Sequence, residues 1–148
     1  MVVVSNPHDG RAFEREFCGC AFSEVDAHLR RGPRNFKDGI RKVKECQCVF
    51  NDWNPRKPRT PLTECLYRRV ASRLRKGEEL RLFITIGTML DLKMGIDCFF
   101  ECDRRIVTVD LTVSSFKKYY RADFLLTRQN FLRNEHYHIG DLIARKLS

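Results

Sequence analysis

The chain has 148 residues, with 28 lysines and arginines against 19 aspartates and glutamates, so its formal charge is +9, and 43% of its residues are hydrophobic. These values predict one basic domain, residues 1–148, large enough to bury a core without covalent cross-links. No apolar run reaches the roughly 18 residues that a membrane span needs, and the apolar residues 1–4 lack a basic segment typical of a signal peptide. We therefore expect an intracellular protein, cytoplasmic or nucleoid-associated, with no membrane partner.

Seven cysteines are an odd number, which argues against a disulfide framework in a chain of this length. Two C-x-C pairs are present, and together they offer four thiolates for a structural Zn²⁺ ion, at Cys18, Cys20, Cys46 and Cys48. Structural zinc sites usually place two to four residues between paired cysteines, so this spacing is tighter than usual. A small structural zinc protein therefore stays an alternative, and free thiols are the ordinary interpretation.

Residues 1–59 contain short possible helices at 13–22 and 36–49, separated by glycine and proline, and we expect an irregular, helical, basic lead-in. Thr60 is a suitable N-cap, followed by proline, and apolar residues then recur at helical spacing as far as Gly77. The later pattern predicts, in order, three strands, a short helix, a fourth strand and a closing helix, at 80–87, 95–102, 105–114, 115–120, 122–127 and 139–147. This order indicates an α/β or α+β domain with a mixed sheet over residues 60–148.

The charge is distributed unevenly along the chain. Residues 30–59, 60–77 and 115–148 carry net charges of +7, +4 and +4, whereas residues 78–114 carry −3. Carboxylates oppose phosphate binding, so a protein that only coats a polyanion has no reason to gather them in its most strand-like segment. A protein that holds a cation beside phosphates has such a reason.

The second and third predicted strands meet at Asp103 and Arg104. A hairpin symmetric about this pair places residues opposite each other when their numbers add to 207, so Asp97 faces Asp110. One face of this hairpin is then apolar, from Ile96 to Val113, and the other carries the two aspartates. Like charges directly across a strand pair cost about 0.2–1 kcal/mol, and a bound divalent cation reverses that cost. A solvated face on which the two carboxylates separate into water is the alternative.

The order helix, three-strand meander, short helix and strand, with Gly95-Ile96-Asp97 and Val109-Asp110-Leu111-Thr112 on adjacent strands, resembles the core of the PD-(D/E)xK nuclease superfamily. The match covers roughly residues 60–127. The resemblance implies a restriction-endonuclease-like fold and Mg²⁺- or Mn²⁺-dependent hydrolysis of phosphodiester bonds. It implies metal ligands at Asp97, at Asp110, at the carbonyl of Leu111 and, from the preceding helix, at Glu64.

The chain departs from the family pattern two residues after the second acid, where Thr112 replaces the usual lysine. A threonine hydroxyl hydrogen-bonds a water molecule but supplies no charge. Some members of the superfamily relocate this lysine, and Lys117 is our first choice, with Lys118 and Lys93 also near the strand ends. Without a lysine, the domain would bind nucleic acid and not cut it.

The basic residues outside the acidic centre suit the phosphate backbone of a nucleic acid, most plausibly DNA. We expect contacts from Arg34, Lys37, Arg41, Lys42, Lys44, Arg56, Lys57, Arg59 and Lys118. The leading hypothesis is thus a small metal-dependent endonuclease that hydrolyses DNA or RNA and acts as a monomer or a homodimer. The alternatives are a non-catalytic nucleic-acid-binding module with the same fold and the structural zinc protein.

Overall fold

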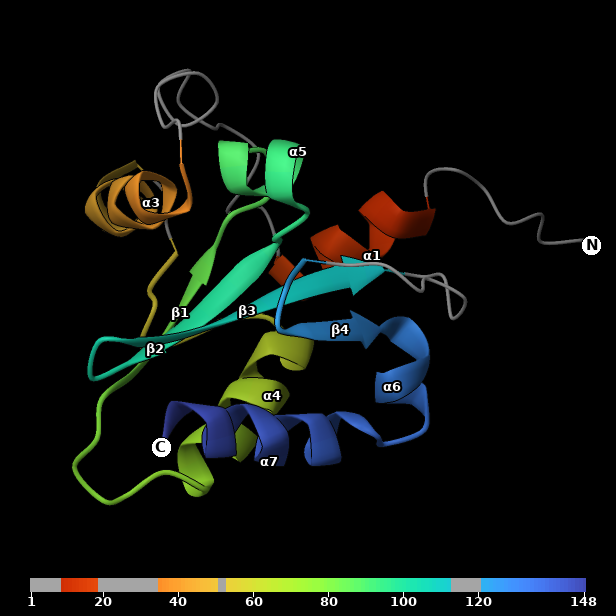
Figure 1. Cartoon of the computed structure of the whole chain (residues 1–148). Coiled ribbons are helices and arrows are strands. Elements are labelled where there is room, and N and C mark those ends of the chain that lie inside the picture. The colour runs from red at the N-terminus through yellow and green to blue at the C-terminus, as the bar shows by residue number, and fades with distance from the viewer. Residues whose placement is uncertain (1–8, 19–34, 51–52, 113–120) are drawn as a thin grey trace, which may run out of the picture.

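A computed structural model of the chain describes residues 9–18, 35–50, 53–112 and 121–148. A four-stranded sheet lies at its centre, and helices lie on both sides of it (Figure 1). The helices are α1 (Asp9–Cys18), α3 (Phe36–Phe50), α4 (Pro61–Ser72), α5 (Met89–Met94), α6 (Arg128–Leu132) and α7 (His136–Leu147). The strands are β1 (Leu80–Ile84), β2 (Cys98–Cys102), β3 (Arg105–Thr112) and β4 (Phe124–Thr127).

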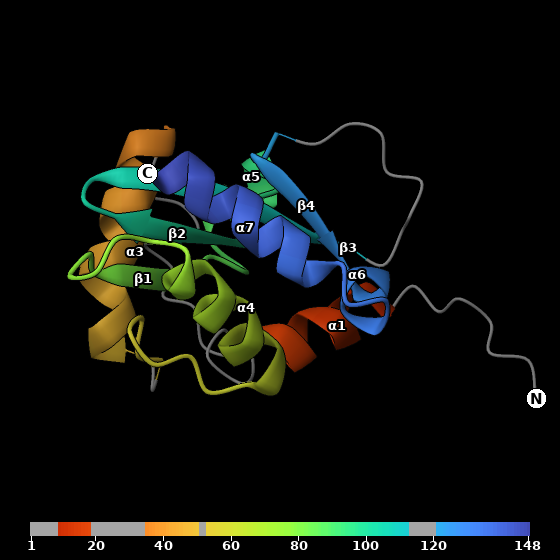
Figure 2. The same ribbon diagram turned by 90° about the horizontal axis from the view of Figure 1, so that it is seen from below.

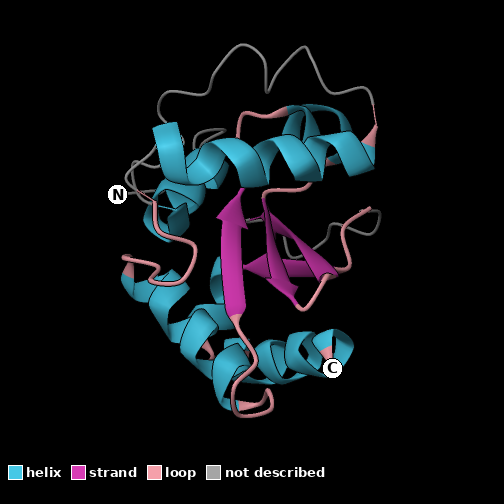
Figure 3. Ribbon diagram, turned by 90° about the vertical axis from the view of Figure 1, so that its left-hand side faces the viewer, coloured by secondary structure: helices cyan, strands magenta, loops and turns pink. Residues whose placement is uncertain are grey.

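The sheet has the order β1-β2-β3-β4. The first three strands form an antiparallel meander, and β4 runs parallel to β3, with Asp110 opposite Leu125 and Thr112 opposite Thr127. Figure 3 shows the strands as a middle layer between two layers of helices. The mixed α/β architecture expected from the sequence is confirmed.

One face of the sheet packs against α1, α4 and α7, and α4 and α7 lie side by side in front of the strands in Figure 2. Alternate strand residues point into this layer, because side chains of a strand alternate between its two faces. Phe100, Val107 and Val109 are fully buried there, with Phe17 from α1 and Leu66 from α4. The segment before residue 60 therefore contributes to the core through α1 and is more than a lead-in.

The opposite face is covered by α3 and α5 and is not the solvated surface that the alternation allowed. Its apolar cluster joins Phe83 and Phe99, stacked at a centroid distance of 5.0 Å, to Ile40 of α3 and Leu90 of α5. Ile96 belongs to this second cluster, and its predicted position on the face of Phe100 is wrong. The reason is that regular pairing of β2 starts only at Cys98, so the alternation does not extend back to Ile96.

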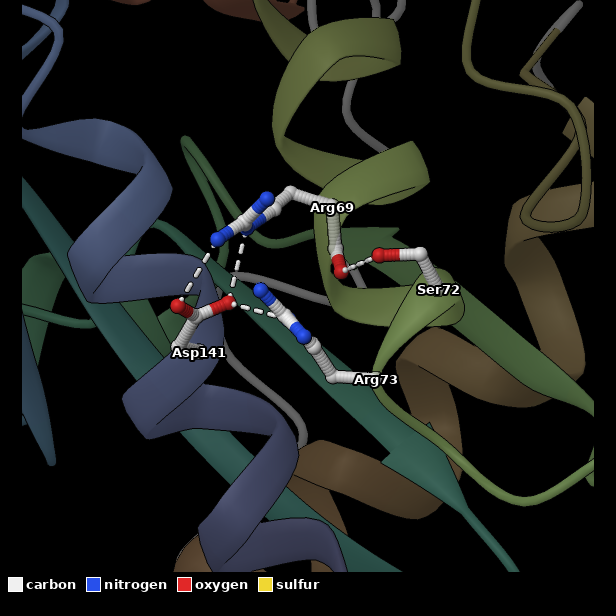
Figure 4. Close-up of polar contacts among 4 residues, drawn as sticks. All are labelled: Arg69, Ser72, Arg73 and Asp141. Carbon is white, nitrogen blue, oxygen red and sulfur yellow. Dashed lines mark hydrogen bonds and ion pairs between the residues drawn. The ribbon is translucent and has the colours of Figure 1, made fainter.

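Helix α4 begins as the sequence predicts, since the Thr60 hydroxyl accepts a hydrogen bond from the N–H of Thr63 at 3.2 Å and Pro61 follows. The helix packs on α7, and a partly buried ion pair joins the two helices. Arg69 donates to both carboxylate oxygens of Asp141, at 2.7 and 2.9 Å, and Arg73 donates to one of them at 3.0 Å (Figure 4). This fork geometry specifies how the two helices align.

The hairpin between β2 and β3 has the predicted two-residue turn. Asp103 and Arg104 both have positive φ, 48° and 68°, as the tight hairpin turn with a right-handed strand twist requires. Neither position is glycine or asparagine, yet the pairing of Cys98 to Cys102 with Arg105 to Val109 follows the predicted register.

Several boundaries differ from the prediction. Helix α4 ends at Ser72 and β1 ends at Ile84, both earlier than predicted, and the short helices α5 and α6 were not predicted from the sequence. Helix α5 fills the connection between the strands predicted at 80–87 and 95–102, for which the sequence pattern predicted no element. Thr88 starts this helix and Gly95, with φ of 66°, ends it. Helix α6 starts with a reciprocal cap between Thr127 and Asn130. The predicted short helix at 115–120 lies outside the described residues.

Among the helices that the structure describes, none is long and apolar enough to cross a membrane.

Candidate functional site

Asp97 lies where the ladder between β2 and β3 changes register. Cys98 pairs with Val109, but the N–H of Asp97 donates to the carbonyl of Val109 at 2.9 Å, so two residues of one strand face one residue of the other. This is the hydrogen-bond pattern of a β-bulge. On the other side the N–H of Thr85 donates to the carbonyl of Asp97 at 2.9 Å, so the pairing with β1 continues. Asp97 consequently does not sit in the simple position across from Asp110 that symmetry about the turn predicts.

The side chain of Asp97 completes the ladder where the backbone does not. Its Oδ2 accepts a hydrogen bond from the N–H of Leu111 at 2.7 Å, while the carbonyl of Ile96 accepts the Thr85 hydroxyl at 2.5 Å. The Asp97 side chain is 3% exposed. The carboxylate is therefore held rigidly between the start of β2 and the end of β3.

Burial raises the pKa of Asp97 to about 10, and the carboxylate of Asp91 on α5 adds to the shift by its charge and by a side-chain hydrogen bond. The Leu111 N–H opposes the rise, and the charge of Glu14 on α1 adds to it. Asp91 in turn accepts a hydrogen bond from the N–H of Gly87 at 2.8 Å. Asp91 and Glu14 are the residues that sequence reasoning missed. Their positions depend on the packing of α5 and α1, and the sequence carries no motif that links them to Asp97.

Asp110 is buried in the middle of the β3 pairing with β4, and it is 4% exposed. Its Oδ2 lies 4.0 Å from the position that a Cβ on Gly95 would occupy, at the point where α5 leads into β2. The charges of both Asp97 and Asp110 act on the buried thiol of Cys98, whose pKa is raised first by burial. The structure thus brings the two aspartates to one neighbourhood around Cys98, at the end of the sheet near α5.

Glu64 takes a different place from the one that the resemblance implied. Its carboxylate is 43% exposed and pairs with Arg68 one helical turn later, at 2.5 Å. The carboxylates that act on Asp97 come from α5 and α1, and Glu64 is not one of them. The reason is geometric, because α4 presents Thr63, Leu66 and Val70 to the sheet and Glu64 lies off that stripe. We do not retain Glu64 as a metal ligand.

The residues expected beside the second acid are only partly described. Leu111 is buried in the core, and Thr112, half-buried, ends β3 opposite Thr127. Lys117 and Lys118 lie outside the described residues. Lys93 is exposed at the last turn of α5, and its carbonyl accepts a hydrogen bond from Arg121 at 3.3 Å.

The predicted phosphate-contacting residues separate into two groups. On α3, Arg41 pairs with Asp38 and Glu45, both at 3.1 Å, and Lys44 pairs with the buried Glu101 at 2.5 Å, so their charges are partly offset. Lys37 and Lys42 also lie on α3. Arg34 is outside the described residues.

The second group lines a surface pocket of about 490 Å³ between the segment before α4 and α4 itself. Four cations and one carboxylate contribute to it, together with Asn54, Pro58 and the ring of Tyr67; the charged residues are Arg56, Lys57, Arg59, Arg68 and Glu64. Arg56 also pairs with Glu79 at 2.7 Å. The excess of cations in this pocket, beside an aromatic ring, suits a phosphate-bearing ligand.

The thiols expected at a zinc site are only partly described. Cys18 is buried in the core, and burial raises the pKa of its thiol, with Cys98 and Asp97 adding to the rise. Cys20 and the side chains of Cys46 and Cys48 lie outside the described part of the chain. Within that part, no group of three or more histidine, cysteine, aspartate or glutamate side chains is arranged to hold a metal ion.

Searches for related proteins returned no matching family, no matching curated protein and no matching solved structure.

Proposed function

We propose that this chain is a metal-dependent nuclease that hydrolyses phosphodiester bonds of DNA or RNA, with Asp97 and Asp110 as its metal-binding carboxylates. The observation that carries the proposal is the burial of two carboxylates, those of Asp97 and Asp110, around Cys98, where burial first and the charge of Asp91 second raise the pKa of Asp97 to about 10 and disfavour its charged form. A divalent cation would favour that charged form. The proposal includes the specific restriction-endonuclease-like fold. The three-strand antiparallel meander followed by a parallel fourth strand supports this fold.

The donor chemistry of the site fits Mg²⁺ or Mn²⁺, because carboxylate oxygens are the ligands that hard cations prefer. Mg²⁺ is commonly held by one or two carboxylates together with waters and substrate phosphates, so a set of three protein ligands is not required. Such an ion, when bound, lowers the pKa of a water molecule and offsets charge that develops on the phosphate. A bound metal ion would lower the pKa of Asp97.

The chain's own groups would perform the remaining tasks. Backbone donation from Leu111 orients the carboxylate of Asp97 toward the end of β3, and the hydroxyl of Thr112 at that strand end can orient a water molecule. The cationic pocket around Arg59 and Arg68 offers a place for phosphates of the substrate. Lys117 stays our proposal for the relocated lysine.

A second candidate is a nucleic-acid-binding module that does not cut. The hydrogen bonds that already occupy Asp97, from Leu111 and with Asp91, favour it, because they allow a purely structural role for a protonated carboxyl. Thr112 in place of lysine points the same way.

Purified protein should be incubated with supercoiled and branched DNA and with RNA, in Mg²⁺, in Mn²⁺ and in EDTA. We expect metal-dependent cleavage that Asp97→Asn and Asp110→Asn each reduce by about 100-fold or more, within the range for losing a group that stabilises the transition state. Glu16→Gln is the matched control and should keep the wild-type rate, because Glu16 is exposed, pairs with Arg128 and belongs to neither the aspartate site nor the cationic pocket. Binding without cleavage in every metal would favour the second candidate, and cleavage that survives Asp110→Asn would remove Asp110 from the site.

A further inference from the structure

The contact between α4 and α7 contains a thiol and an imidazole that no part of the proposed nuclease site uses. Sγ of Cys65 lies 3.1 Å from Nε2 of His136, and the hydroxyl of Tyr137 lies 3.9 Å from the same sulfur. Cys65 is half-buried, whereas His136 is only 4% exposed. The pair therefore joins an accessible nucleophile to a buried base.

The imidazole is fixed in place by its neighbours. Phe131 stacks on it at a centroid distance of 4.8 Å, and the Tyr137 ring lies 4.1 Å from it. Burial lowers the pKa of His136, although the backbone of Asn130 opposes that change. Among the residues that the structure describes, none offers the buried Nδ1 a hydrogen-bond partner of suitable geometry. The ring is consequently neutral near pH 7, and Nε2 is available to accept the thiol proton.

The other cysteines whose side chains the structure describes are in different surroundings. Cys18, Cys98 and Cys102 are 0–1% exposed, and burial is the main cause that raises the pKa of each thiol, that of Cys102 to about 11. Burial of this kind makes a thiol inert. Cys65 differs from these three in its exposure and in its contact with a base.

The hydroxyl beside the thiol belongs to Tyr137, whose ring is also approached by a cation. The guanidinium of Arg69 lies 5.5 Å from the centre of the Tyr137 ring, and its hydrogen bonds to Asp141 hold it there (Figure 4). The Tyr137 hydroxyl can donate a hydrogen bond to an oxygen that leaves as an anion. Because Cys65 is only partly exposed and its partner ring is enclosed by two aromatic rings, the position suits a small reagent.

We propose that Cys65 is a site of covalent modification, at which a small hydroperoxide oxidises the thiol to a sulfenic acid with His136 acting as the base. His136 Nε2 takes the thiol proton, and a sulfur lone pair attacks one oxygen of the peroxide. The S–O bond forms as the O–O bond breaks, and the second oxygen leaves with the proton returned by His136, as water or an alcohol. Sulfur is oxidised by two electrons and the peroxide is reduced by two.

The test is peroxide oxidation followed by a reagent that traps sulfenic acids, with the modified cysteine identified by peptide mass spectrometry. At equal pH, Cys65 should react about tenfold or more faster in the folded protein than in the same chain unfolded in urea. The three buried cysteines should instead react faster in the unfolded chain than in the folded protein, since unfolding exposes them. A Cys65 rate that folding does not raise would overturn the proposal, as would trapping that persists at this peptide in Cys65→Ser.

His136→Gln tests the base directly, with folding checked by circular dichroism. Glutamine keeps a polar group at this position but cannot take the proton, so we expect the Cys65 rate to fall about tenfold or more. An unchanged rate in the folded variant would show that the imidazole has only a structural role. Should this variant fail to fold, the comparison between folded and unfolded wild-type protein still decides the matter, because it needs no substitution.

Discussion

The N–H of Leu111 donates a hydrogen bond to the carboxylate of Asp97 at 2.7 Å, so a side chain completes a β-ladder that the backbone leaves at the Asp97 bulge. This contact buries an acidic group between two strands and beside Asp91. It also ties the end of β3, where Thr112 lies, to the start of β2. The stability of this end of the sheet should therefore depend on the protonation of Asp97.

The first prediction concerns pH. The pKa of Asp97 is about 10 in the folded chain and near 4 when unfolded, so between these values the unfolded state releases a proton that the folded state keeps. The contribution of Asp97 to stability is full below pH 4 and falls as the pH rises toward 10. Asp97→Asn should thus stabilise the metal-free protein at pH 8, by on the order of 1 kcal/mol or more. Thermal melts at pH 4 and pH 8 measure this. Equal melting shifts at the two pH values would contradict it, and Glu64→Gln is the control.

Metal binding should act in the opposite direction at the same residue. Mg²⁺ or Mn²⁺ added at pH 8 should raise the melting temperature of the wild-type protein, by an amount equivalent to about 2.7 kcal/mol when the free ion is 100 times its dissociation constant. Asp97→Asn should respond much less. The same experiment with Ca²⁺ and with EDTA shows whether the effect is selective. An equal rise in both proteins would place the ion elsewhere.

The turn at Asp103 and Arg104 offers a stabilising substitution. Arg104 has φ of 68°, where a side chain costs on the order of 1 kcal/mol and glycine does not. Arg104→Gly should raise the free energy of unfolding by about that amount, measured in urea, and the side chain that it removes is exposed. The control is Arg105→Gly, in the strand, which should destabilise because glycine weakens a strand. A destabilised Arg104→Gly would mean that the turn relaxes to another type.

Gly39 is a position where helix propensity and packing disagree. Alanine favours a helix by about 1 kcal/mol over glycine. A Cβ at Gly39, however, would lie 2.8 Å from Cδ2 of Leu90, which is fully buried between α3 and α5. We expect Gly39→Ala to destabilise the protein by about 1–3 kcal/mol, the usual range for overpacking. In a Leu90→Ala background, Gly39→Ala should cost less than it does in the wild-type protein, and a double-mutant cycle would measure this difference.

The ion pair that aligns α4 and α7 should weaken in acid. The hydrogen bond from Arg69 is the main cause that lowers the pKa of Asp141, and Arg73 adds to it. A lowered pKa means that the stabilisation exists above the unfolded pKa and is lost as the pH falls through the folded value. Asp141→Asn should lower the melting temperature at pH 7, and this effect should shrink progressively as the pH falls below the unfolded pKa of about 4. Salt should reduce the difference, because the groups are close to solvent.

The sequence predicted the parts of the fold that depend on neighbouring residues. Thr60 and Pro61 predicted the start of α4, and alternation in residues 105–114 predicted the strand that the structure has as β3 at 105–112. The two-residue turn fixed the pairing of Phe100 with Val107, which the structure has. These features follow from local geometry and from the period of the hydrophobic residues.

Other features required the tertiary structure. The predicted register of the hairpin ends at Asp97, where a bulge forms. This bulge depends on contacts with β1, α5 and the end of β3 together, so no local sequence pattern predicts it. The same holds for the approach of Asp91 and Glu14 to Asp97. Burial and like charge at that point come from residues far apart in the chain.

By itself, the sequence determined that this is a basic α/β chain with an acidic strand region, and it singled out Asp97 and Asp110. Only the tertiary structure decided that Asp97 is buried beside Asp91, that Glu64 pairs with Arg68, and that Cys65 meets His136. The physical reason is that periodicity and capping act over a few residues, whereas pKa shifts and ion pairs depend on which side chains packing brings within a few ångströms.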